Sequence, residues 1–308
     1  MRGTRIVLRS IRMIMNDYII ATSSTCDLPL TWLEEHNIPF ISYSYTNNEQ
    51  PAIDDCREES RAAIYAGMRK GDILKTSQIN EPAYDQFFRK LLDTGKNVLF
   101  LDMSEKMSVS FENCRSAAEK VRGDYAGQEL YVMDTRCISG GLGLLLMHCV
   151  ELMENGKSFE EVIAWGEENR LKIAHRFTVD DLNYLKRGGR VSNASALVGT
   201  MLSIKPVLYV PDGGTLEVVK KCIGRKKALH TILDGILHDL SKVETNGLDM
   251  LILHADCRED AEFIRTSVLK AHPDMGEIRI SSLGVVIGAH TGPGLLAIFY
   301  ICTGRSAE

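Results

Sequence analysis

The stretch VLFLDMSEKMSVSFENCRSAAEKVRGDYAGQELYVMD, residues 98–134, contains two short apolar runs with a longer, more polar segment between them. Val98–Asp102 and Leu130–Asp134 are predicted to be strands, and Phe111–Val121 is predicted to be a helix. A strand, a helix and a second strand in this order are typical of a βαβ unit, in which the two strands run parallel. The stretch therefore predicts an α/β fold with a parallel sheet.

The same alternation continues on both sides of this stretch. The further predicted elements of the first half are the strands Tyr18–Ala21 and Ile38–Tyr43 and the helices Leu30–Glu35, Arg57–Arg69, Glu81–Leu92 and Leu142–Met153. Ser158 followed by Glu161 is a capping box that begins another helix, Glu160–Leu171. We place a domain boundary there, with an N-terminal parallel-sheet α/β domain in residues 1–158 and a C-terminal mixed α/β domain in residues 159–308.

The second half mixes hairpin and helix signals. Its predicted elements are the helices Leu182–Lys186 and Arg225–Leu240 and the strands Pro206–Val210, Thr215–Lys220, Met250–His254 and Ile278–Ser281. Asp212-Gly213-Gly214 predicts a hairpin between the first two of these strands. Residues 283–302 carry no charge, but glycines and Pro293 interrupt them. We therefore expect two buried strands around a polar turn rather than a membrane span.

The composition is that of a globular protein, because 44% of the 308 residues are hydrophobic and 25% are charged. This length favours two domains. The formal net charge of −5 lacks the basic excess that is usual in nucleic-acid-binding proteins, so we expect no nucleic-acid partner. Arginines interrupt the apolar runs of residues 1–16, so we expect an upstream extension there, with the natural start at Met13 or Met15, and not an export signal.

The eight cysteines are too far apart for a C-x-x-C motif. Their scatter through apolar segments predicts buried thiols in a reducing cytosol, and hence a cytoplasmic protein. No metal site is predicted. Asp54-Asp55 could bind magnesium, but nothing nearby completes a site, and we expect these acids to be a solvated helix start.

Two short motifs resemble phosphate-binding loops and fail on spacing. Gly156-Lys157-Ser158 has Glu151 where a P-loop has its first glycine, so it is predicted to be a connection between helices. Gly141-x-Gly143 has Leu146 in place of the third glycine of a dinucleotide fingerprint. We therefore expect a close strand–helix turn there. No sequence motif of a known catalytic machinery is present.

Hydroxyl side chains recur where predicted strands meet helices. Residues 22–25 follow the first strand, Thr76 and Ser77 precede a helix that Asn80 caps, and Ser104 and Ser108 follow the strand ending at Asp102. Any one of them is more simply a helix cap. Three such loops at the carboxyl ends of strands together predict an anion site with neutral donors, suited to a singly charged carboxylate.

His290 lies in the turn Gly288-Ala289-His290-Thr291-Gly292-Pro293-Gly294. A histidine between glycines is most often structural. Because this turn lies between two apolar runs, the imidazole is expected at the edge of a dry core, where it can hold an anion or transfer a proton.

At these residues the sequence resembles the DegV family of bacterial lipid-binding proteins. The resemblance covers nearly the whole chain from Asp17. It rests on Ser24-Thr25-Cys26-Asp27-Leu28-Pro29, Thr76-Ser77-Gln78, residues 103–110, Val132-Met133-Asp134, Leu185-Lys186-Arg187-Gly188-Gly189-Arg190-Val191-Ser192, Ser203-Ile204-Lys205-Pro206-Val207-Leu208 and the His290 turn.

This resemblance implies a two-domain DegV-like (EDD) fold that buries one long-chain fatty acid between its domains and needs no other cofactor. It also implies that the carboxylate is presented to a separate fatty acid kinase, which makes the acyl phosphate for phospholipid synthesis. The residues that would hold the carboxylate are Thr76 or Ser77, Ser108 and His290. Arg187 and Arg190 would contact the kinase or the transferred phosphate, as arginine suits phosphate. A transient membrane contact is compatible with this role.

Two positions depart from the family pattern. Ser23 stands where the family usually has Asp, and Val109 stands in place of the glycine of a Ser-Gly-Thr motif. Val109 is expected to add bulk beside the head-group position.

Two other classes of function remain open from the residues alone. The first is a hydrolase or phosphotransferase that uses Ser108 with His290 in a hydroxyl-rich cleft. The second is an interaction protein with an incidental cavity.

Overall fold

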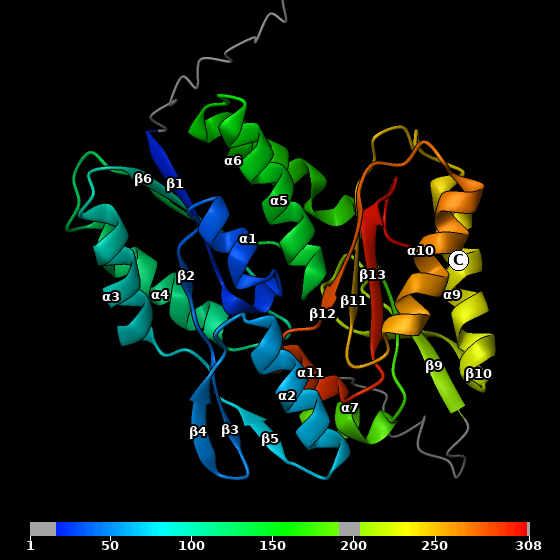
Figure 1. Ribbon diagram of the computed structural model, residues 1–308. Coiled ribbons are helices and arrows are strands. Elements are labelled where there is room, and N and C mark those ends of the chain that lie inside the picture. Colours follow the sequence, from blue (N-terminus) through cyan, green and yellow to red (C-terminus); the bar gives the residue numbers. More distant parts are fainter. Residues whose placement is uncertain (1–16, 191–203, 307–308) are drawn as a thin grey trace, which may run out of the picture.

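The computed structural model describes residues 17–190 and 204–306. The first half of the chain forms a four-stranded parallel sheet with the order β2-β1-β6-β7. Its strands are β1 (Tyr18–Ser23), β2 (Phe40–Ile41), β6 (Asn97–Asp102) and β7 (Leu130–Asp134). Helices α3 (Glu81–Leu92) and α4 (Ser110–Arg122) lie on one side of this sheet, and α1 (Leu30–Glu35) lies on the other (Figure 1). The predicted βαβ unit is confirmed.

A small antiparallel sheet projects from the first half. It has the order β4-β3-β5 and consists of β3 (Ser44–Asn47), β4 (Gln50–Ile53) and β5 (Leu74–Thr76). Helix α2 (Glu58–Arg69) connects β4 to β5. The strand predicted over 38–43 is present but shorter, because β2 has only two residues. The missed hairpin is a two-residue turn in which Asn48 and Glu49 both have positive φ, and it lacks the usual glycine.

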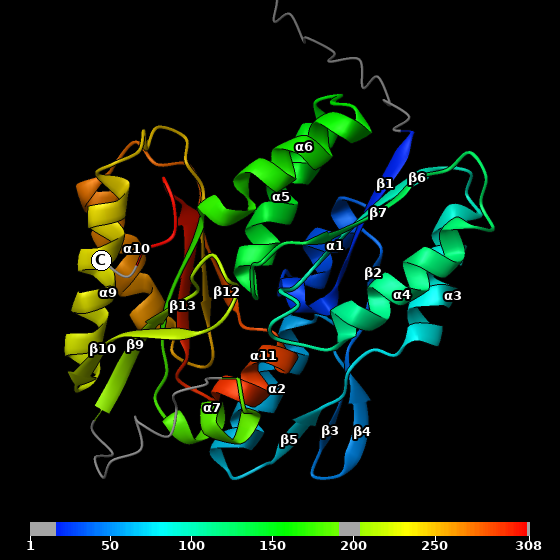
Figure 2. The ribbon, with the colours of Figure 1, turned by 180° about the vertical axis from the view of Figure 1, so that it is seen from behind.

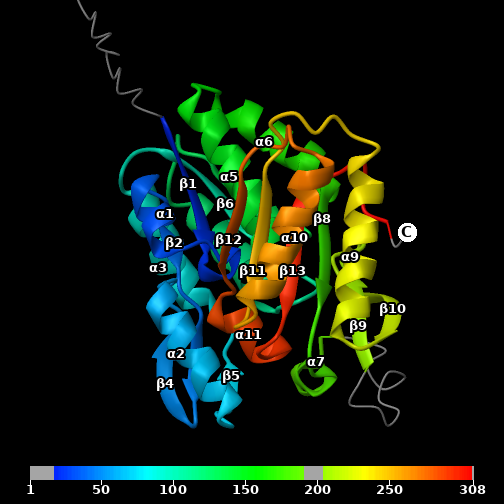
Figure 3. The same ribbon diagram turned by 45° about the vertical axis from the view of Figure 1, so that its right-hand side comes forward.

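The second half forms a six-stranded mixed sheet with the order β10-β9-β8-β13-β11-β12. Its strands are β8 (Ile173–Thr178), β9 (Ile204–Tyr209), β10 (Glu217–Ile223), β11 (Met250–His254), β12 (Ile278–Ser282) and β13 (Leu296–Ile301). Strands β11 and β12 are parallel, and the other neighbours are antiparallel. Helices α9 (Arg225–Leu240) and α10 (Arg258–Ala271) cover its outer face (Figure 3). The mixed sheet is confirmed. Strand β8 was missed because the polar residues His175 and Arg176 obscure a fully buried strand.

Helix α5 (Gly140–Glu154) lies between the two sheets and packs against both (Figure 2). Its apolar residues are buried all round, and α6 (Phe159–Asn169) follows it after a capping box of Ser158 and Glu161, as predicted. A Cβ atom on Gly141 would lie 2.0 Å from His175 Nε2, and one on Gly143 would lie 2.5 Å from the carbonyl oxygen of Cys26. Both glycines lie at the start of α5 and not in the strand–helix turn that was predicted there, and close packing explains them.

The uncharged stretch 283–302 corrects another prediction. It contains a helix, α11 (Val285–Thr291), followed by β13, and not two strands. The β-branched residues of α11 favoured a strand in the sequence, but tertiary packing against α7 (Leu182–Gly188) and β5 overrides that preference. No helix in the described ranges combines the length and the apolar character that a crossing of the bilayer requires.

The position of Asp54 differs from the prediction of a solvated helix start. Asp54 is only 1% exposed and does not belong to a solvated helix start. It lies in a buried cluster with Asp27 and the fully buried Arg61, whose positive charge lowers the pKa of both carboxyl groups.

All eight cysteines are free thiols, and seven of them are buried, as predicted. The predicted extension of residues 1–16, and the motif residues Val191, Ser192 and Ser203, lie outside the described part of the chain.

Candidate functional site

One cavity of about 120 Å³ collects the predicted carboxylate-binding residues. Thr76 ends β5, Ser77 follows it, Ser108 precedes α4, and His290 lies in the last turn of α11. All four line this cavity. The side chains come from both halves of the chain, and the packing of α11 against β5 brings His290 to Thr76.

His290 and Thr76 form a direct hydrogen bond. The Oγ1 atom of Thr76 and the Nε2 atom of His290 are 2.8 Å apart. Burial, with a smaller effect of the Arg190 charge, lowers the pKa of His290 to about 4. The imidazole is therefore neutral at pH 7 and carries a single N–H. If that proton is on Nε2, it is donated to Thr76, which leaves the threonine hydroxyl free to donate to a ligand.

Ser108 is oriented by its neighbour Ser110. The Ser108 hydroxyl donates to Ser110 Oγ over 2.9 Å, and the backbone N–H of Ser110 donates back to Ser108 Oγ over 3.1 Å. Ser110 Oγ also accepts the N–H of Ile79 over 3.0 Å. The sequence did not single out Ser110 as a site residue. Its role is to hold Ser108 at the cavity wall.

Tyr43 is a cavity residue that the sequence reading missed. It is 2% exposed, it lines the cavity, and its phenol interacts with Ser110, Ser108 and Tyr84. Burial and then the nearby Asp102 carboxylate raise the pKa of Tyr43 above its usual range, so it stays a hydrogen-bond donor. No sequence signal identified Tyr43, because it ended a predicted strand.

Asp102 supports this side of the cavity from behind. Its carboxylate accepts hydrogen bonds from the Tyr84 hydroxyl at 2.9 Å and from the Ser23 hydroxyl at 2.6 Å. Burial raises the pKa of Asp102 to about 6. The hydroxyls of residues 22–25 are all buried in contacts within the protein and none of them lines the cavity, so this loop does not contribute to the predicted anion site.

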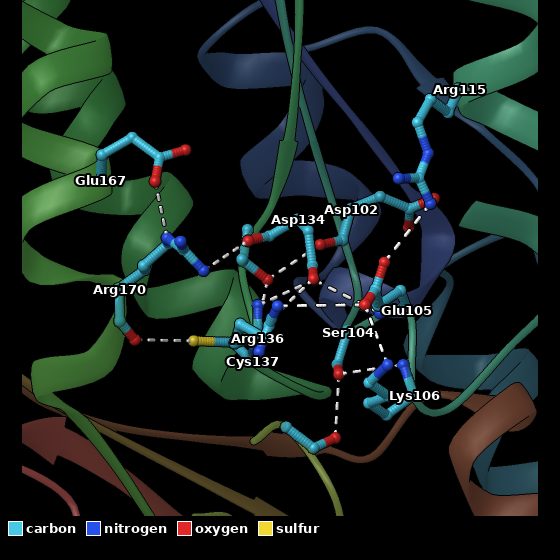
Figure 4. A network of polar contacts seen from close by, with 12 residues as sticks. Asp102, Ser104, Glu105, Lys106, Arg115, Asp134, Arg136, Cys137, Glu167 and Arg170 are labelled. Atoms are coloured by element: carbon cyan, nitrogen blue, oxygen red, sulfur yellow. Dashed lines mark hydrogen bonds and ion pairs between the residues drawn. The ribbon is translucent and has the colours of Figure 1, made fainter. Parts of the chain in front are cut away.

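Ser104 also has a structural role. Its hydroxyl donates to the carbonyl oxygen of Gly214 over 2.8 Å, away from the cavity. Figure 4 shows Ser104 in a network of ion pairs at the carboxyl ends of β6 and β7, in which Arg136 pairs with Asp134 at 2.8 Å. Thus Ser108, but not Ser104, contributes to the candidate site.

The two arginines of the Gly-Gly segment occupy different places. Arg190 lines the cavity, and its Nε donates to the carbonyl oxygen of Met107 over 3.3 Å. Arg187 is exposed and its guanidinium lies 4.6 Å from the centre of the Tyr184 ring, outside the cavity lining. Only Arg190 therefore places positive charge beside the polar residues of the site.

A second, smaller cavity adjoins the first. It has a volume of about 40 Å³, and its lining is mainly apolar, including Phe177, Leu295 and Phe299. The two cavities share the lining residues Ile138, Leu216, Ile287 and Thr291. His175 lines the inner cavity with its polar atoms engaged, since Nε2 accepts the Ile138 N–H and Nδ1 bonds to the Ile173 carbonyl. A polar pocket that adjoins an apolar one suits an amphiphilic ligand.

Val109 is located at the cavity rim. It lines the cavity but remains 58% exposed, so most of its side chain faces solvent. Its bulk therefore lies at the entrance more than at the head-group position itself.

Ser108 and His290 share the cavity without bonding to each other, because Ser108 donates to Ser110 and His290 contacts Thr76. No cluster of three or more metal-ligating side chains occurs within residues 17–190 and 204–306.

Comparisons with known proteins agree with this architecture. The family model for "Uncharacterised protein, DegV family" matches residues 18–303. A DegV domain-containing protein of Clostridium perfringens is 35% identical over 288 residues, which cover 93% of this chain and 98% of the relative. A DegV domain-containing protein of Lactococcus lactis is 31% identical over 284 residues, covering 92% of this chain and 96% of the relative.

Solved structures with the same fold include fatty-acid-binding proteins. A DegV family protein from Thermus thermophilus, described by its fatty acid binding, is 28% identical with a TM-score of 0.81, covering 92% of this chain and 99% of that one. DegV from Bacillus subtilis, described as a fatty acid binding protein, is 27% identical with a TM-score of 0.79, covering 93% and 99%. The family match and the shared fold show that this chain belongs to the DegV family.

Proposed function

We propose that this protein binds one long-chain fatty acid between an N-terminal domain of residues 1–158 and a C-terminal domain of residues 159–308. The observation that carries the proposal is the pair of adjoining cavities, one lined by hydroxyl groups and a neutral histidine and the other lined mainly by apolar side chains. The carboxylate is held by Thr76, Ser77, Ser108 and His290, and the acyl chain extends toward Phe177 and Phe299. Relatives described as fatty acid binding support the same ligand class.

The physical chemistry of the two cavities fits the two ends of such a ligand. Each buried methylene contributes about 0.8 kcal/mol, so a long chain binds tightly without many polar contacts. A hydrogen bond to a charged group contributes about 1.5–3 kcal/mol, so two or three neutral donors suffice for the carboxylate. Arg190 adds a positive charge at the same end of the cavity.

The binding proposal is tested with delipidated protein by calorimetric titration with oleate and palmitate. Thr76→Val keeps the shape of the side chain and removes its hydroxyl, so we expect affinity to fall about tenfold or more. Thr76→Ser keeps the hydroxyl and is the matched control, with an affinity near that of the wild type. Equal affinities for wild type and Thr76→Val would contradict the assignment of the carboxylate to this end of the cavity.

We extend the proposal to presentation of the bound carboxylate to a separate fatty acid kinase, which phosphorylates it. Arg190, at the cavity, and Arg187, exposed on the same segment, are the groups that contact the kinase or the transferred phosphate. Arginine suits this role, because its planar guanidinium binds phosphate with two hydrogen bonds. Eight free thiols are typical of a reducing compartment, which supports a cytoplasmic location for such a reaction.

The two roles separate on mutation. Arg187→Ala and Arg190→Ala are expected to retain fatty acid binding and to lower acyl-phosphate formation with the cognate kinase. We expect Arg190→Ala to lower acyl-phosphate formation more than Arg187→Ala does, because Arg190 lines the cavity and Arg187 does not. Acyl-phosphate formation at the wild-type rate in both variants would remove the proposed role. Hydrolysis of acyl esters by the purified chain would instead favour the enzyme reading of Ser108 and His290.

A further inference from the structure

The outer and inner cavities adjoin, and the four side chains that line both of them are here called the wall. The outer cavity measures about 120 Å³ and the inner one about 40 Å³. The residues that line both are Ile138, Leu216, Ile287 and Thr291. A ligand that starts at the hydroxyl groups and continues into the inner cavity must pass this wall.

Three of the four wall residues are held by helices or by short hydrogen bonds. The N–H of Ile138 donates to His175 Nε2 over 3.1 Å. Ile287 and Thr291 lie one turn apart on α11, where the Thr291 hydroxyl donates to the Ile287 carbonyl over 2.9 Å. Leu216 differs, because it is carried by the connection between β9 and β10 and not by a helix or strand. It is 8% exposed, so its side chain fills space inside the wall.

Hydrogen bonds hold the connection that carries Leu216 at two points. At one point, Ser104 donates to the Gly214 carbonyl over 2.8 Å. Gly214 has a φ of 74° and lies so close to Ser104 that a Cβ atom would be 2.2 Å from its hydroxyl oxygen. At the other point, Arg305 donates to the Pro211 carbonyl over 3.2 Å and to the Arg136 carbonyl over 2.7 Å. The position of Leu216 is therefore set by contacts with both halves of the chain.

We propose that Leu216 determines how much of an acyl chain the protein accommodates. The inference rests on the proposed fatty acid binding and adds a specificity-determining residue to it. Thr76 and His290 line the outer cavity, Phe177 and Phe299 line the inner one, and Leu216 lines both, so an acyl chain that runs from the first pair to the second passes Leu216. Rotation of the leucine side chain, or a small shift of its loop, joins the two cavities into one slot. The size of residue 216 then sets the length beyond which further methylenes gain no burial.

The test is a chain-length series of saturated fatty acids, from decanoate to stearate, titrated into delipidated protein. For wild type we expect affinity to rise about fourfold per methylene as long as each added methylene is buried. Leu216→Trp narrows the passage, so its affinity should stop rising at a shorter chain. Leu216→Ala widens the passage, so its affinity should continue to rise to a longer chain than in the wild type. Leu216→Met nearly conserves volume and is the control, with the wild-type profile.

The outcomes separate the inference from the function on which it rests. The same chain-length limit in wild type, Leu216→Trp and Leu216→Ala would overturn the role of Leu216 while leaving fatty acid binding intact. Binding of no chain by the wild type would overturn the proposed function, and this inference with it. If Leu216→Trp fails to fold, as circular dichroism would show, the comparison of Leu216→Ala with Leu216→Met still decides between the two results.

Discussion

The imidazole of His290 lies between Thr76, to which it is hydrogen-bonded, and Gly188, whose backbone packs against its Nδ1 side. The ring is largely withdrawn from solvent and lies near the positive charge of Arg190, and both effects oppose a second proton on the ring. A neutral histidine at this position acts through hydrogen bonding and not through charge.

The protonation of His290 can be followed directly in ligand-free protein. Its pKa is lowered to about 4, compared with an ordinary value near 6.5, so we expect the ring to remain neutral down to about pH 5. Nuclear magnetic resonance of ring-labelled histidine gives the titration, and loss of the signal in His290→Gln assigns it. A midpoint near pH 6.5 would contradict the assigned environment.

At the scale of elements, the site depends on the contact between α7 and α11. Gly188 ends α7, and a Cβ atom on it would lie 2.5 Å from His290 Nδ1. The next residue, Gly189, has a φ of 66° and no neighbour within 4 Å of its Cβ position. The two adjacent glycines are thus required for different reasons, the first for close approach and the second for a left-handed backbone.

This difference gives a matched pair of variants. Gly188→Ala is expected to push His290 away from Thr76 and lower fatty acid affinity about tenfold, the effect of losing one hydrogen bond to a charged group. Gly189→Ala is expected to cost about 1 kcal/mol of stability from backbone strain and to leave affinity unchanged. Titration and urea denaturation of both variants check this. Equal loss of affinity in the two variants would refute the proposed contact.

The elements themselves were largely predictable, and the exceptions have physical reasons. Leu30–Glu35, Glu81–Leu92 and Arg225–Leu240 were predicted with their observed ends, because local signals decide them, such as the Asn80 cap of the second helix and the apolar periodicity of the third. Strand β8 and helix α11 were not predicted, because their environments are set by residues distant in sequence. A buried strand with Arg176 and a helix rich in valine contradict local propensity.

Among the site residues, too, those with a local sequence signal were predicted and those placed by distant parts of the chain were not. Thr76, Ser77, Ser108 and His290 were identified from the positions of hydroxyls, the glycine-rich segment and the family resemblance, and the structure brings them to one cavity. Tyr43 and Leu216 were not identified. Tyr43 reaches the cavity through the folding of a short hairpin, and Leu216 through a loop fastened by Ser104. Neither position carries a local pattern that differs from ordinary core.

At the scale of the whole molecule, a buried charged cluster connects distant parts of the chain. Arg61 is fully buried, and it donates to the carbonyl of Leu28 over 3.0 Å and to that of Ser282 in β12 over 2.9 Å. Burial raises the pKa of the nearby Asp27 to about 7, although Arg61 and the Ser139 hydroxyl oppose this effect. The association of the two sheets is therefore linked to the protonation of a buried carboxyl group.

The sign of this linkage is testable. Between about pH 4 and pH 7 the folded protein retains a proton on Asp27 that the unfolded chain has released, so stability falls as pH rises through this range. The slope from one such group is at most about 1.4 kcal/mol per pH unit. The raised pKa of Asp102 also makes stability fall as pH rises. We expect the free energy of unfolding, measured by urea denaturation, to decrease less between pH 5 and pH 7 in Asp27→Asn than in the wild type. A decrease as steep as that of the wild type would exclude Asp27 as its source.

Native mass spectrometry of the purified full-length protein, with identification of the organic extract, tests the central claim most directly. We predict that the protein carries close to one fatty acid per chain, because the polar and apolar cavities together form one binding site. After delipidation, addition of oleate or palmitate should restore a mass increase of one ligand. A homogeneous mass equal to that of the chain alone, with no shift after either fatty acid is added, would contradict the account.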